Sequence, residues 1–96
     1  MNLHFELHAQ QELDDAVAYY DGVSMRLGNH FIEEVERVIS QILNFPKACP
    51  ELSPSTRRCR IKRFPYGVIY RVGKDEIEII AVMHFSREPN YWVDRL

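Results

Sequence analysis

Basic side chains are concentrated in one short segment of this sequence. Residues 52–74 contain seven Lys or Arg and no Asp or Glu, although the whole chain has a formal net charge of −2. Arg58, Arg60 and Lys62 alternate with apolar residues, which is the period of a β-strand. The three cations would share one strand face at intervals of about 7 Å, a spacing that matches successive phosphates of a nucleic acid. The segment predicts a surface for an anionic partner; the alternative is a solvated face balanced by the acidic helices.

A second group of candidates lies nearer the C-terminus. His84 is the histidine closest to the basic segment, at the end of a strand predicted over residues 77–85. An imidazole titrates near neutrality, so His84 is a candidate proton shuttle. Strict alternation would place it on the same strand face as Val82 and Ile80. The alternative is a structural histidine that only forms hydrogen bonds.

Further candidates surround these residues. Arg87 is a candidate phosphate clamp, and Tyr91 is a candidate for base stacking or proton donation. Tyr91 and Trp92 could equally serve as core or partner contacts. The other candidates for anion binding are Arg57, Lys62, Arg63 and Arg71.

Length and composition predict one globular domain spanning residues 1–96, with 46% hydrophobic and 27% charged residues. No apolar run approaches the roughly 18 residues that cross a membrane. The first ten residues lack the basic and apolar regions of a secretory signal. We therefore expect a cytoplasmic protein. The His and Cys residues do not have metal-ligand spacing, so neither a metal nor another cofactor is expected.

The two cysteines, Cys49 and Cys59, are ten residues apart. A structural disulfide is not expected between them in a reducing compartment. Cys59 falls within a predicted strand, so we interpret it as a small buried residue.

Two amphipathic helices are predicted in the first half of the chain. Residues 3–7 alternate as in a short strand, and helical spacing begins at Ala9. The first helix should end in a C-cap or turn at Gly28 and Asn29. The second should end before Pro46, because proline disfavours helical geometry in the preceding residue. The proline-rich residues after it predict an irregular loop.

The second half of the chain predicts strands over residues 57–63, 68–72 and 77–85, joined by short turns. The last of these has an unbroken apolar run, which indicates a central strand covered on both faces. Pro89 could open a short terminal helix. The expected fold is α+β: an N-terminal strand, an antiparallel helical hairpin on one face of a small antiparallel sheet (β-α-α-β-β-β), and a short C-terminal helix or tail.

Three segments carry a resemblance to a known family. "RFPYGVIYRV" (63–72) and "HFSREPNYW" (84–92), following "AVAYYDGVSMRLGNHFIEEVERVI" (16–39), resemble RelE/ParE superfamily toxins of bacterial type II toxin–antitoxin (plasmid stabilization) modules. The resemblance covers the chain from Leu3 to Arg95. It implies a small α+β toxin, held silent in an oligomer with a cognate antitoxin protein.

The resemblance implies one of two activities. RelE-like members cut mRNA on the ribosome, whereas ParE-like members inhibit DNA gyrase without a known hydrolytic site. For cleavage, Arg58 and Arg60 would occupy the positions of basic catalytic residues and stabilise the transition state, beside the three candidates described above. Gly67 departs from the nuclease pattern, which has an Arg there. The co-occurrence of His, Arg and Tyr favours a metal-independent mRNA endonuclease; the alternatives are a non-catalytic gyrase inhibitor and an inert paralogue that only binds its antitoxin.

Overall fold

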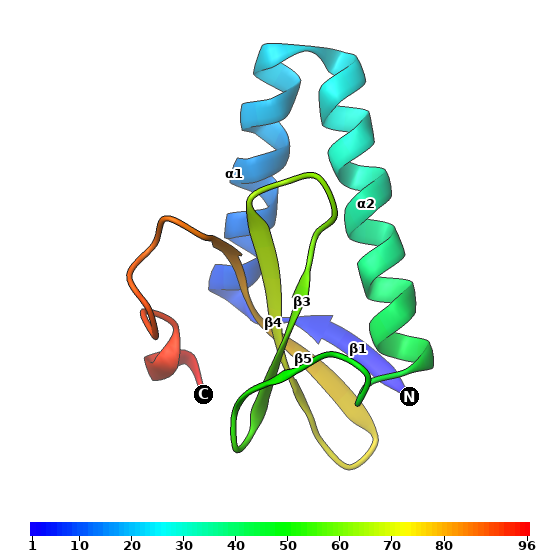
Figure 1. Cartoon of the computed structure of the whole chain (residues 1–96), viewed down its shortest axis with the longest axis vertical. Coiled ribbons are helices and arrows are strands. Elements are labelled where there is room, and N and C mark those ends of the chain that lie inside the picture. The colour runs from blue at the N-terminus through cyan, green and yellow to red at the C-terminus, as the bar shows by residue number, and fades with distance from the viewer.

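The computed structural model describes all 96 residues as a five-stranded sheet with two helices against one face (Figure 1). The elements in chain order are β1 (Asn2–Phe5), α1 (Leu7–Val23), α2 (Met25–Asn44), β2 (Glu51–Ser53), β3 (Thr56–Arg60), β4 (Tyr66–Val72), β5 (Glu76–His84) and a 3-10 helix η1 (Val93–Arg95). The predicted α+β class, the helical hairpin and the short C-terminal helix are confirmed. Neither long helix combines the length and apolar character that crossing a bilayer requires.

The sheet differs from the prediction at both edges. Its strand order is β1-β5-β4-β3-β2, and β1 pairs parallel to β5 while all other pairs are antiparallel. The extra strand β2 lies in the proline-rich stretch that was expected to be irregular. It pairs with β3 in a tight hairpin, across which the hydroxyls of Ser53 and Thr56 lie 2.6 Å apart.

The predicted helix boundary at Gly28 and Asn29 is wrong, because both residues lie inside α2. The chain breaks at Ser24 instead, which ends α1 and caps α2 by accepting a hydrogen bond from the Leu27 amide. A Cβ on Gly28 would clash with the side chain of Asp21 in α1. The glycine therefore permits close helix approach. The predicted end of α2 before Pro46 is confirmed.

Two apolar clusters cover the two faces of the sheet. The larger one lies between the helices and the sheet, and its largest members include Phe31, Tyr70 and Ile42. The smaller one lies on the opposite face, under the C-terminal segment, and consists of Ile69, Ile80, Ala81, Met83 and Trp92. The prediction that β5 is central and covered on both faces is therefore confirmed.

A β-bulge changes which residues of β5 face the helices. Ile69 pairs with Ala81 but its neighbour Tyr70 pairs with Ile79, so Ile80 has no direct partner. Ile80 consequently joins the smaller cluster, whereas Val82 joins the helix-facing core. The predicted shared face of His84, Val82 and Ile80 is wrong for Ile80.

The expectation of unpaired cysteines is also wrong. Cys49 and Cys59 form a disulfide with a Cα–Cα distance of 5.4 Å. The β2–β3 hairpin folds back between them, which brings the loop after α2 beside β3. Burial of Cys59 was predicted correctly, since only 3% of its surface is exposed.

Candidate functional site

Three arginines surround a hollow on the sheet face opposite the helices. The guanidinium carbons of Arg58 and Arg60 lie 5.6 and 4.9 Å from the centre of the Phe85 ring. Arg87, from the segment after β5, borders the same hollow, whose volume is about 300 Å³. We call this hollow with its three arginines the basic cleft. Alternation along β3 sends Arg58 and Arg60 to this face, while Cys59 points into the helix-facing core.

The cations of the basic cleft are not neutralised from within the chain. No carboxylate lies within 4.0 Å of Arg58, Arg60 or Arg87. Two other predicted anion-binding residues are already paired. Arg57 contacts Glu51 at 3.2 Å and also donates to the carbonyl of Cys49, and Arg71 contacts Glu78 at 2.6 Å. The three arginines of the cleft therefore keep their positive charge free for an external anion.

The two remaining anion-binding candidates follow the end of β3. Because β3 ends at Arg60, Lys62 lies in the β3–β4 turn and does not continue a regular strand row. Arg63 lies in the same turn with a φ of 72°, the left-handed region that turns use. Both side chains are exposed and have no carboxylate partner. Of the three cations predicted to form a row, Arg58 and Arg60 lie on one face of β3, and Lys62 lies just beyond the end of the strand.

Gly67 explains how Phe85 reaches the cleft. It pairs with Arg60 across β3 and β4. A Cβ at Gly67 would lie 3.0 Å from the Phe85 ring and 3.1 Å from the side chain of Arg58. The absence of a side chain at this position therefore makes room for the aromatic floor between the arginines.

His84 lies on the other face of the sheet, toward the helices. The centres of the His84 and Tyr66 rings lie 5.0 Å apart, with the rings edge to face. His84 also lines a hollow of about 260 Å³ together with Glu12, Asp15 and other residues. The imidazole Nδ1 accepts hydrogen bonds from the amide of Ser86 at 3.0 Å and its hydroxyl at 2.7 Å. Because an amide nitrogen only donates, the neutral ring carries its proton on Nε2.

The five candidate catalytic residues are consequently divided between two sides of the sheet. Arg58 and Arg60 border the basic cleft, and His84 and Tyr91 border the hollow toward α1. Arg87 lines both. The predicted set meets only at the sheet end where β5 gives way to the C-terminal segment.

Glu12 of α1 organises the C-terminal segment. Its carboxylate accepts hydrogen bonds from the Tyr91 hydroxyl at 2.6 Å, from Arg95 at 2.7 and 3.2 Å, and from the Val82 amide at 3.1 Å. Arg95 also donates to the carbonyl of Ile80. The Glu12–Arg95 pair thereby satisfies backbone groups of β5 beyond the point where β1 ends.

The Tyr91 hydroxyl donates its proton to the hydrogen bond with Glu12 and is not free for another acceptor. Burial, and then the hydrogen bond and charge of Glu12, raise the pKa of Tyr91 well above the usual range. The guanidinium carbon of Arg87 lies over the Tyr91 ring, 3.9 Å from its centre. Burial lowers the pKa of Arg95, but the hydrogen bond and charge of Glu12 outweigh it, so the net shift is upward. These contacts make Tyr91 a positioning residue for Arg87.

Sequence reasoning missed Glu12, although a signal was present. The residues of α1 that become buried are Ala9, Ala16 and Tyr20, and Glu12 falls on the same helical stripe as Ala9 and Ala16. An acid on a stripe of small apolar residues indicates a partner from another element.

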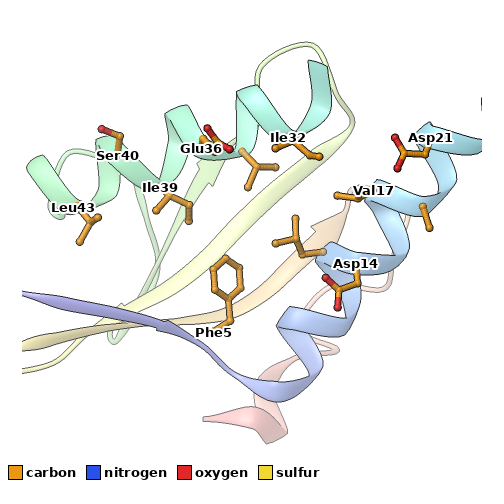
Figure 2. Close-up of a pocket in the computed structure, with 12 residues that line it drawn as sticks. Phe5, Asp14, Val17, Asp21, Ile32, Glu36, Ile39, Ser40 and Leu43 are labelled. Atoms are coloured by element: carbon orange, nitrogen blue, oxygen red, sulfur yellow. The ribbon is translucent and has the colours of Figure 1, made fainter. Parts of the chain in front are cut away.

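A larger apolar groove lies between α1, α2 and β1, with a volume of about 720 Å³. Figure 2 shows Phe5 of β1 and Ile39 of α2 directed toward one another across it. Acidic side chains border it, namely Asp14, Asp21 and Glu36. This arrangement suits an apolar segment of a partner that carries basic residues along its flanks. We call it the helix groove.

Comparisons with known proteins agree with this architecture. Residues 3–89 match the model of a family described as the ParE toxin of the type II toxin–antitoxin system parDE. Toxin ParE2 from two strains of Mycobacterium tuberculosis is 32% identical over 85 residues, covering 84% of this chain and 78% of the relative. A chain of the chromosomal ParDE system from P. aeruginosa has the same fold, with a TM-score of 0.57 and 23% identity over 88% of this chain and 95% of that one. The chain therefore belongs to the ParE toxin family of type II toxin–antitoxin systems.

Proposed function

We propose that this ParE-family toxin inhibits DNA gyrase by binding it, and that an antitoxin encoded beside it neutralises the toxin. One observation carries the non-catalytic part of the proposal. His84 lies on the opposite side of the sheet from Arg58 and Arg60. Because gyrase is an enzyme of the cytoplasm, the toxin is expected to act there, where reducing conditions favour the dithiol form of Cys49 and Cys59.

Cleavage of RNA makes geometric demands that this arrangement does not readily satisfy. A base must reach the 2′-hydroxyl within hydrogen-bond distance while cations contact the same phosphate. Here the Nδ1 of His84 is bonded to Ser86, and the Tyr91 hydroxyl is bonded to Glu12. Neither group is aimed into the basic cleft. A toxin that inhibits its target by binding alone does not need a base and cations around the same phosphate.

The mRNA endonuclease is the second candidate function, and one observation favours it. Arg87 borders both the basic cleft and the hollow around His84. A nucleotide chain that crossed the end of β5 would pass Arg87 and approach both sides.

Purified toxin should be added to gyrase in a supercoiling assay, and total RNA from cells expressing the toxin alone should be mapped by primer extension. The proposed function predicts loss of supercoiling, no codon-phased cuts, and retained inhibition by His84→Ala. Codon-phased cuts that disappear in His84→Ala would establish the endonuclease instead. A toxin without either effect would match the inert paralogue.

We further propose that the helix groove receives an amphipathic helix of the antitoxin with Lys or Arg on its flanks. The apolar lining and the acidic border of the groove, Asp14, Asp21 and Glu36, support this charge pattern. Leu43→Glu should weaken antitoxin binding, because Leu43 lines the groove and is 40% exposed. Val23→Glu is the matched control, since Val23 is exposed outside the groove. Equal affinities of the two variants in titration calorimetry would contradict this placement.

A further inference from the structure

We propose that the basic cleft binds the phosphodiester backbone of DNA, so that the toxin contacts the DNA held by its protein target as well as the target itself. The inference rests on the proposed function for the presence of DNA at the site of action. It goes beyond that function by assigning the cleft a nucleic-acid ligand of its own.

The charge of the cleft is the first support. Arg58, Arg60 and Arg87 border a single hollow and have no carboxylate partner, whereas Arg57 and Arg71 are paired within the chain. Guanidinium groups present two parallel N–H donors, which match the oxygens of a phosphate. Three unpaired guanidinium groups around one hollow repel one another, and this repulsion is relieved when an anion binds.

The arginines are also held in place before any ligand arrives. Arg58 and Arg60 lie over the Phe85 ring, and Arg87 lies 3.9 Å from the centre of the Tyr91 ring. Tyr91 is in turn fixed by its hydrogen bond to Glu12. Side chains that are already ordered lose less conformational entropy on binding. The cleft is thus prepared for a ligand with closely spaced charges.

The position of the cleft favours a nucleic acid over an acidic peptide. An extended peptide commonly binds by adding a strand to a free sheet edge, where backbone groups give most of the affinity. The cleft lies on a sheet face, and the outer edge of β3 is covered by β2. It therefore offers charged side chains without a free strand edge. A phosphodiester chain carries a charge on every residue and needs no such edge.

Salt dependence measures the number of phosphate contacts. Three contacts with duplex DNA give a slope of about −2.7 in a plot of log affinity against log salt, which is roughly a 40-fold loss between 50 and 200 mM salt. Removing one contact should reduce this loss to about 12-fold. Fluorescence anisotropy of a labelled 20-base-pair duplex, titrated with purified toxin, measures both values.

The variants Arg58→Gln, Arg60→Gln and Arg87→Gln should each show the smaller salt dependence. Arg60→Lys should keep the larger one because the charge is retained. Lys74→Gln is the matched control: it removes one unpaired cation from the β4–β5 turn, outside the cleft. Circular dichroism verifies that each variant is folded.

Several results would overturn the inference. One is a salt dependence that falls equally in Lys74→Gln and in the cleft variants. Another is tighter binding of single-stranded RNA or of a Glu-rich peptide than of DNA, with the cleft variants affecting that ligand alone. Gyrase inhibition without DNA binding by the cleft would contradict only this inference, whereas DNA binding without gyrase inhibition would contradict only the proposed function.

Discussion

The hydrogen bonds that converge on Glu12 hold the C-terminal segment against α1 and β5, and Glu12→Ala removes all of them. Arg95 would keep a charge whose side chain is only 15% exposed, and the Tyr91 hydroxyl and the Val82 amide would lose their acceptor. Removing one partner of a fully buried ion pair costs about 3–5 kcal/mol. The Glu12–Arg95 pair is only partly buried, so we expect a cost at the lower end of that range, about 3 kcal/mol, including the two further hydrogen bonds. Because a chain of this length has a free energy of unfolding of about 5–14 kcal/mol, the variant should lose a large fraction of its stability.

Trp92 provides a direct readout of this change. It is the only tryptophan of the chain, is 2% exposed, and lies within the segment that Glu12 anchors, between Tyr91 and Arg95. Urea unfolding followed by tryptophan fluorescence and by far-UV circular dichroism gives the free energy of unfolding. The Tm of Glu12→Ala should fall by at least about 12 °C, at about 4 °C or more per kcal/mol for a domain of this size.

Glu33→Ala is the matched control, since Glu33 is exposed on α2 and has no ion-pair partner. Its free energy of unfolding should stay within about 0.5 kcal/mol of the unchanged protein. The reasoning is refuted if Glu12→Ala loses less than about 1 kcal/mol while the emission maximum of Trp92 in water stays unchanged.

Two further predictions concern stability. Because the pKa of Tyr91 is raised, the folded state keeps the hydroxyl proton above pH 10.0, where an unfolded tyrosine loses it. The free energy of unfolding should therefore be constant below about pH 10 and fall as the pH rises further. Urea titrations at pH 8 to 11 should show a smaller fall for Tyr91→Phe than for the unchanged protein. Removing the Cys49–Cys59 bond, which closes a loop of ten residues, should lower the free energy of unfolding by about 2–3 kcal/mol through loop-closure entropy. Cys49→Ala should therefore be less stable than the unchanged protein, and this difference in stability should vanish when dithiothreitol is added.

Local patterns in the sequence were sufficient for most of the fold. The helical stripes, the stop before Pro46 and the apolar run of β5 each depend on neighbours within a few residues, and the structure confirms them. Gly28 shows the limit of such reasoning. A glycine near a helix end commonly serves as a cap, but here it makes room for Asp21 of the other helix. That contact is not visible from local sequence.

The candidate site was harder to predict because it depends on contacts between distant residues. A single bulge at Ile80 shifts the alternation of β5, so Ile80 leaves the face that it was predicted to share with Val82 and His84. Glu12 meets its partners 70 to 83 residues further along the chain. The exposed cations Arg58 and Arg60 were predicted more reliably, since alternation over three residues of one regular strand sufficed.

A double-mutant cycle between His84 and Arg60 tests most directly whether the toxin acts by binding rather than by catalysis. The toxin concentration for half-inhibition of gyrase supercoiling would be measured for His84→Ala, Arg60→Ala and the double variant. Because the two residues lie on opposite faces of the sheet, the account predicts that their fold-changes multiply, with a coupling below about 0.5 kcal/mol. The account is contradicted if each single variant by itself raises this concentration as much as the double variant does, which is the behaviour of residues in one catalytic unit.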